Sequence, residues 1–114
     1  MQADQLFELC HQQSKDMGWW PEPPNDLIVS LKLMLIVSEI AEGFEGLRKS
    51  LKDDHLPHRD MLEVELADAV IRIADLAEVL NYNLEGAMLE KLKYNRTRFD
   101  HSAEGRAAEG GKKF

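Results

Sequence analysis

The sequence contains little of what marks a secreted, membrane-spanning or zinc-binding protein. Its single cysteine, Cys10, excludes an internal disulfide bond and a zinc site made of cysteines. No apolar run approaches the roughly 18 residues of a membrane span, and the first residues lack the basic end and apolar core of a signal peptide. We therefore expect a cytoplasmic protein with no membrane partner.

Basic residues are also few. The chain has 14 lysines and arginines against 21 aspartates and glutamates, which gives a formal net charge of −7. This balance argues against nonspecific binding to a nucleic acid polymer or an anionic membrane. A polyphosphate ligand would need metal ions or a local basic cluster to offset the repulsion, so free nucleotides fit this charge better than DNA.

Histidines with the spacing of common metal enzymes are absent as well. The four histidines are scattered along the chain at His11, His55, His58 and His101. None stands in a Glu-x-x-His pattern, which disfavours a carboxylate-bridged di-iron bundle. A zinc hydrolase would need a spaced histidine pair, which is also missing.

What is present is helical periodicity, which predicts an all-α fold. We expect an antiparallel four-helix bundle with helices at about residues 3–17, 26–51, 58–80 and 84–99. With 114 residues and a hydrophobic fraction of 44%, the chain has room for one modest core. Residues 1–100 are the expected single domain. Residues 101–114 contain few apolar side chains to bury and are expected to form a mobile tail with a basic end.

Proline and capping residues set the first boundaries. Three prolines within residues 19–24 remove backbone donors and predict an extended loop. Asn25 or Asp26 is then expected to cap the second helix. A polar loop at residues 52–57 separates the second helix from the third.

Two short acidic motifs lie inside apolar helical stretches: Glu39-Ile-Ala-Glu42 and Glu65-Leu-Ala-Asp68. Residues three apart on a helix lie on nearly the same face, so each motif presents two carboxylates side by side. Two such helices packed together would bring four carboxylates close, which favours a hard divalent cation, Mg²⁺ above all. The alternative is that these residues belong to solvated helix faces, as acidic residues commonly do.

A second group of polar residues falls on one stripe of the fourth predicted helix. Lys91, Asn95 and Arg98 are spaced at i, i+4 and i+7, and together they could hold a phosphate chain. A solvated helix face is the alternative interpretation. Lys112 and Lys113 could likewise fold over phosphates or form a solvated end.

Other residues near the motifs have open roles. Trp19 and Trp20 precede the first acidic helix and could stack on a nucleobase or fill the core. Arg72 and Asp75 follow Asp68 on a similar helix face, where they could touch a ligand or pair with another helix.

In the order and spacing of these motifs, the chain resembles the MazG-like all-α nucleoside triphosphate pyrophosphatases. The resemblance spans residues 27–98 and is carried by the two acidic motifs, the apolar helix that follows the second motif, and residues 91–98. It implies Mg²⁺-dependent hydrolysis of a nucleoside or deoxynucleoside triphosphate to the monophosphate and pyrophosphate, with Mn²⁺ as a possible substitute. Such an enzyme would clear or balance nucleotide pools.

The resemblance also implies roles for individual residues. The catalytic metal ligands would be Glu39, Glu42, Glu65 and Asp68. Lys91, Asn95 and Arg98 would contact phosphates or sugar, and Trp20 is the candidate for the base. Some relatives carry a further glutamate before the first motif, where this chain has Ser38, so the general base is unassigned and Glu45 is one candidate to supply it.

The second and third predicted helices are apolar on more than one face. Leu33, Leu35, Ile36 and Ile40 cannot all point into one small core, so we expect self-association. The resemblance implies a dimer or tetramer. The alternative to an enzyme is a helical oligomerisation or regulatory module with an acidic metal-binding surface.

Overall fold

The computed structural model describes residues 1–97, 103–108, 110–111 and 113. These residues form helices and no strands, so the predicted all-α class is confirmed. The chain divides into two compact units, Met1–Tyr82 and Asn83–Phe114. The predicted single domain over residues 1–100 and the complete four-helix bundle stay predictions.

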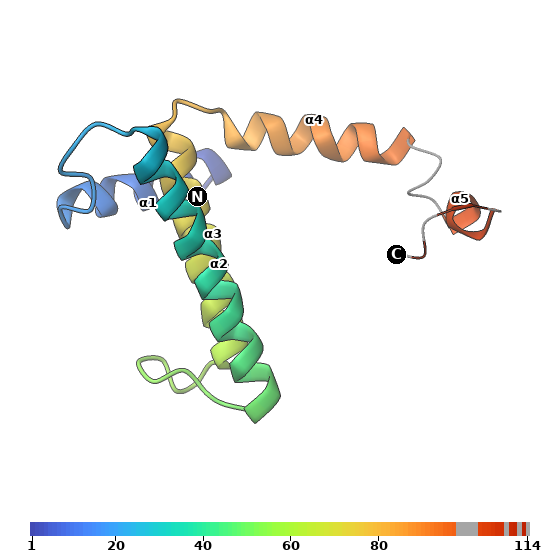
Figure 1. Ribbon diagram of the computed structural model, residues 1–114, viewed down its shortest axis with the longest axis horizontal. Coiled ribbons are helices and arrows are strands. Elements are labelled where there is room, and N and C mark those ends of the chain that lie inside the picture. The colour runs from blue at the N-terminus through green and yellow to red at the C-terminus, as the bar shows by residue number, and fades with distance from the viewer. Residues whose placement is uncertain (98–102, 109, 112, 114) are drawn as a thin grey trace. The chain divides into compact units, whose positions relative to one another are not determined.

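The first unit consists of three helices: α1 (Ala3–Asp16), α2 (Asp26–Lys49) and α3 (Met61–Val79). α2 and α3 run antiparallel and lie side by side, and α1 packs against α3 (Figure 1). The α2–α3 pair is therefore the frame on which both acidic motifs are placed.

Local side-chain chemistry fixes both ends of α2. The side-chain Oδ1 of Asn25 accepts a hydrogen bond from the backbone N–H of Ile28 at 2.9 Å, which confirms the predicted cap. At the other end Ser50 adopts a left-handed backbone conformation with φ of 52° and stops the helix.

The connection to α3 is more ordered than its polar composition predicted. Asp53 Oδ2 accepts hydrogen bonds from the backbone N–H groups of His55 and Leu56 at 3.0 and 2.8 Å, and Lys52 pairs with Asp60 in an isolated antiparallel bridge. These contacts hold residues 52–60 outside the helix. α3 therefore begins at Met61 rather than at His58, where the sequence analysis placed its start.

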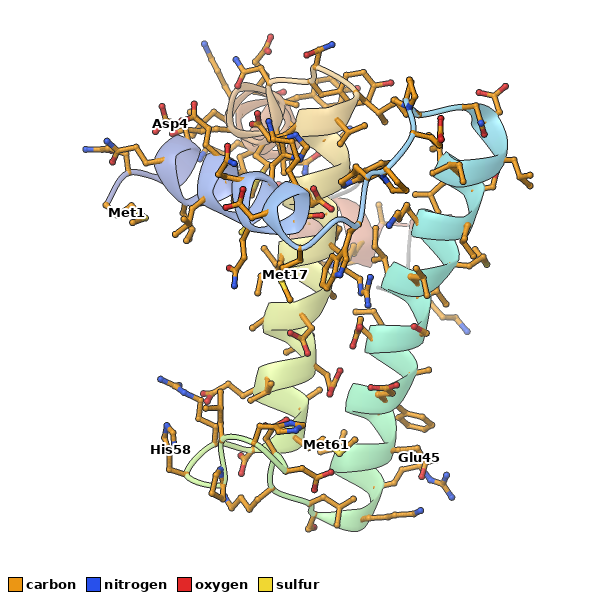
Figure 2. All side chains as sticks on the ribbon, turned by 90° about the vertical axis from the view of Figure 1, so that its left-hand side faces the viewer. Met1, Asp4, Met17, Glu45, His58 and Met61 are labelled. Atoms are coloured by element: carbon orange, nitrogen blue, oxygen red, sulfur yellow. The ribbon has the colours of Figure 1, made fainter. Side chains whose placement is uncertain are left out.

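Two glycines let α2 and α3 approach closely. A Cβ atom added to Gly46 would lie 2.8 Å from the Cβ of Met61, and one added to Gly43 would lie 3.3 Å from the Cβ of Glu65. Figure 2 shows Met61 between the two helices, whereas Glu45 lies on the side of α2 away from α3. The close approach next to Gly43 brings the acidic residue of α3 towards those of α2.

The second unit contains α4 (Leu84–Thr97) and a short helix, α5 (Ala103–Ala107). Asn83 precedes α4, and its Oδ1 accepts a hydrogen bond from the backbone N–H of Gly86 at 2.9 Å. α5 lies in the segment expected to be a mobile tail, where the sequence predicted no helix. The mobility of this segment stays a prediction.

The chain buries few large apolar side chains. Within the described residues, the buried hydrophobic residues are Ala69, Ala74, Leu76 and Ala77. α2 instead carries a stripe of exposed apolar residues spaced alternately four and three apart, here called the apolar stripe: Leu33, Val37, Ile40, Phe44 and Leu47. None of the described helices is both long enough and apolar enough to cross a bilayer.

Candidate metal centre

The α2–α3 pair brings together residues from both acidic motifs. Glu39 and Glu42 lie on α2, Glu65 lies on α3, and one carboxylate oxygen from each lies within 4.8 Å of the other two. These three residues, here called the acidic triad, were predicted from their spacing in the sequence. Three carboxylate oxygens at this separation match the ligands that hard divalent cations prefer.

Glu65 is the most perturbed member of the acidic triad. It is only 7% exposed, and its Oε2 has no hydrogen-bond partner among the described residues. A hydrogen bond with Glu39, followed by burial and the charges of nearby carboxylates, raises the pKa of Glu65 to about 8. The same hydrogen bond is the main cause that lowers the pKa of Glu39.

These properties fit a cation site. A buried carboxylate oxygen without a partner is costly, and here it belongs to a group that faces two further carboxylates. Without a cation, the site keeps a proton on one carboxyl group to limit the repulsion. A divalent cation would supply both the missing partner and the missing positive charge.

Asp68, the fourth predicted ligand, stands one helical turn beyond Glu65 and is not part of the triad. Its carboxyl group is still close enough for the charges of the triad to affect its pKa. Burial is the largest cause that raises the pKa of Asp68, and the charges of Glu39 and Asp53 add to it. Its role as a ligand stays a prediction.

Arg72 provides a positive charge at the edge of the triad. Its Nε donates a hydrogen bond to Glu39 Oε1 at 2.8 Å, and its guanidinium carbon lies 5.7 Å from the centre of the Trp19 ring. From the sequence, Arg72 could either touch a ligand or pair with another helix. In the structure it pairs with Glu39 of α2.

Asp75 forms a polar centre between α1 and α3. Of the two roles that the sequence left open for it, the structure contains the pair with another helix, and the partners themselves were not predicted. The carboxylate is 5% exposed. It accepts hydrogen bonds from Ser14 Oγ at 2.8 Å, from His11 Nδ1 at 2.8 Å, and from Trp20 Nε1 at 2.9 Å. Asp75 thereby fixes α1 and the loop after it against α3.

The two tryptophans occupy different environments. The N–H of Trp20 is bound to Asp75, and the ammonium nitrogen of Lys32 lies 4.6 Å from its ring centre. Trp19, in contrast, lines a cavity of about 260 Å³ together with Asp68 and residues of α1. The remaining lining residues are Cys10, Gln13, Ser14, Met17 and Ile71. Base stacking by Trp20 stays a prediction, but it is Trp19 that lines the cavity beside a predicted metal ligand.

The predicted stripe of the fourth helix belongs to the second unit. Lys91 and Asn95 line the same open hollow on α4, and the buried Oδ1 of Asn95 has no hydrogen-bond partner within the described residues. The ammonium of Lys91 lies 4.8 Å from the ring centre of Tyr94. Arg98 and Lys112 lie outside the described residues. The predicted contacts of this stripe with a nucleotide stay predictions.

The position before the first motif offers no carboxylate. Ser38 donates a hydrogen bond from its hydroxyl to the backbone carbonyl of Leu35 at 2.7 Å. Glu45 forms ion pairs with Arg48 and, at 3.4 Å, with Lys49. Since Glu45 is bound to its own helix neighbours and points away from α3 (Figure 2), the arrangement does not bring it into the triad.

No protein-family model, curated protein or solved structure matches the chain. The likeness to MazG-like pyrophosphatases therefore rests on the motifs themselves, and membership of that family stays a prediction.

Proposed function

We propose that the protein is a Mg²⁺-dependent nucleoside triphosphate pyrophosphohydrolase, which converts a nucleoside or deoxynucleoside triphosphate to the monophosphate and pyrophosphate. The observation that carries the proposal is the acidic triad, in which the buried Glu65 has an oxygen without a hydrogen-bond partner and its carboxylate lies beside two glutamates of the neighbouring helix. The specific reaction is proposed because the order of the motifs resembles that of MazG-like enzymes. Nucleotide-pool maintenance in the cytoplasm is the proposed setting.

The donor set fits the proposed cofactor. Mg²⁺ prefers carboxylate oxygens, keeps several waters and takes phosphate oxygens as further ligands, and Mn²⁺ accepts the same donors. Bound at such a site, the metal would neutralise phosphate charge and supply activated water. Glu39, Glu42 and Glu65 would hold it, with Asp68 as the fourth proposed ligand.

The cavity beside Asp68 is the proposed place for the nucleobase. Its aromatic wall is Trp19, and stacking of a base on an aromatic ring contributes about 1 to 3 kcal/mol. A volume of about 260 Å³ is enough to admit a planar ring system. Lys91, Asn95 and Arg98 remain the proposed phosphate or sugar contacts because a lysine, an amide and an arginine offer suitable donors.

Self-association is part of the proposal. The apolar stripe of α2 repeats every three or four residues, as in the seam of a helical bundle. α3 continues the pattern with the exposed residues Leu66, Val70 and Ile73. We propose that a second copy covers these residues in a homodimer or tetramer built as a bundle.

The exposed apolar surface also favours a second candidate function. A helical oligomerisation or regulatory module would need the same self-complementary helices, and its acidic triad would bind metal without turnover. Only product formation separates this candidate from the enzyme.

The test is a panel of canonical and modified triphosphates incubated with the purified protein and Mg²⁺, with pyrophosphate, phosphate and nucleotide products resolved. The variants are Glu42→Gln and Asp68→Asn, with Glu63→Gln as the matched control because Glu63 is exposed and pairs with Arg59. Light scattering would check that each variant keeps its oligomeric state. Monophosphate plus pyrophosphate, lost in the first two variants and kept in the control, supports the enzyme, whereas no turnover with Mg²⁺ or Mn²⁺ favours the module.

A further inference from the structure

Arg72 is bound to one of the proposed metal ligands. Its Nε donates to Glu39 Oε1 at 2.8 Å, and the two side chains are only 27% and 12% exposed. A guanidinium carries five N–H donors, and within the described residues its one hydrogen bond is to Glu39. Arg72 therefore satisfies Glu39 while keeping most of its own donors for another anion.

Arg72 also contacts a residue that lines the cavity proposed for the base. Its guanidinium lies over the ring of Trp19, and Trp19 lines the cavity together with Asp68. A guanidinium released from Glu39 would remain anchored on this ring at the edge of the cavity. Arginine can bind phosphate through two parallel hydrogen bonds, which makes a phosphate chain a fitting second acceptor.

We propose that Arg72 is the internal counter-ion of the cation-free triad, and that it passes from Glu39 to the phosphates when metal and triphosphate bind together. The inference rests on the proposed function and adds a residue that couples the two ligands. A metal ion alone must compete with Arg72 for Glu39 and meets its positive charge. A metal bound with a triphosphate does not, because the phosphates take over the guanidinium. Arg72 thus weakens binding of free metal and strengthens binding of the metal–triphosphate complex.

The test compares Arg72→Met with the wild type in two binding measurements. Electron paramagnetic resonance gives the affinity for Mn²⁺ alone, and calorimetry gives the affinity for preformed Mn²⁺–tripolyphosphate, a probe without a base. Compared with the wild type, we expect Arg72→Met to bind Mn²⁺ alone at least about fivefold more tightly. We expect it to bind the Mn²⁺–tripolyphosphate complex at least about fivefold more weakly. A factor of about five is the lower end of the usual coupling between two binding sites. If Arg72 only supported the fold, its replacement would weaken the binding of both Mn²⁺ and the Mn²⁺–tripolyphosphate complex.

Two further variants make the outcome decisive. Arg59→Met removes the same charge from an exposed ion pair with Glu63 and should leave both affinities unchanged. Arg72→Lys keeps the positive charge, so its affinity for free Mn²⁺ should lie within about twofold of the wild-type affinity. This variant also tests the counter-ion role if Arg72→Met does not fold. If Arg72→Met binds free Mn²⁺ no more tightly than the wild type, or Arg72→Lys matches Arg72→Met, Arg72 is not the counter-ion. If neither the wild type nor Arg72→Met binds free Mn²⁺ or the Mn²⁺–tripolyphosphate complex, the proposed function falls together with this inference.

Discussion

Replacing Glu65 with glutamine is expected to remove a pH-dependent cost from the folded state. The pKa of Glu65 rises from 4.5 to about 8 because the carboxyl group is hydrogen-bonded to Glu39 and buried. The folded state therefore binds the proton more tightly than the unfolded state. The contribution of the Glu65 carboxyl group to the free energy of unfolding is complete below pH 4.5 and is lost as the pH rises towards and through 8.

The size of the effect follows from the same pKa. At about 1.36 kcal/mol per pH unit, the interval from 4.5 to about 8 sets an upper limit of about 4.8 kcal/mol. The lowered pKa of Glu39 changes stability only below about pH 4.5 and leaves this interval unaffected. Solvent screening at the site reduces the upper limit, so we expect a net loss on the order of 3 kcal/mol between pH 4.5 and 9. Glutamine keeps a neutral N–H donor for Glu39 at every pH.

The assay is unfolding by heat and by urea at pH 5 and pH 9, in EDTA and at one protein concentration. Glu65→Gln should match the wild type at pH 5 and exceed its unfolding free energy by about 2 to 3 kcal/mol at pH 9, equivalent to roughly 10 °C in melting temperature. Added Mg²⁺ should stabilise the wild type and not the variant. Glu63→Gln, at an exposed position on the same helix, should show no such pH dependence. An equal difference between Glu65→Gln and the wild type at both pH values would refute this reasoning.

Three further substitutions test the frame around the triad. Asp75→Asn should lower the unfolding free energy by about 2 to 3 kcal/mol, because three side-chain donors lose a charged acceptor; an unchanged urea midpoint and unchanged Trp20 fluorescence would contradict this. Gly46→Ala should cost about 1 kcal/mol in urea unfolding, since the contact of its new Cβ with Met61 at 2.8 Å outweighs the gain in helix propensity; a more stable variant would mean that the helices separate freely. Phe44→Glu, on the apolar stripe, should shift sedimentation to the monomer, and an unchanged mass would remove that stripe from the interface.

The helices and the triad were predictable because both depend on local spacing. Apolar periodicity located α1, α2, α3 and α4, and the i, i+3 spacing of Glu39 and Glu42 placed them on one helix face. The start of α3 was missed because Asp53 ties the preceding loop to its own backbone, a contact that composition does not reveal. α5 was missed because a helix of five residues carries too little periodicity to detect.

The contacts around the triad depend on packing between distant residues. Arg72 and Glu39 are 33 residues apart, and Ser14 and Asp75 are 61 apart. Spacing along one helix says nothing about such partners. Gly43, in the interior of α2, was a usable signal, since a glycine in a helix lowers stability unless another element must approach it.

The most direct test of the proposed reaction is hydrolysis of nucleoside triphosphates in ¹⁸O-labelled water with Mg²⁺, followed by mass spectrometry of the products. Attack at the α-phosphorus predicts the label in the monophosphate and unlabelled pyrophosphate, with both products lost in Glu42→Gln. Label in orthophosphate or pyrophosphate, or no turnover of any triphosphate tested, would contradict the assignment of the protein as a pyrophosphohydrolase.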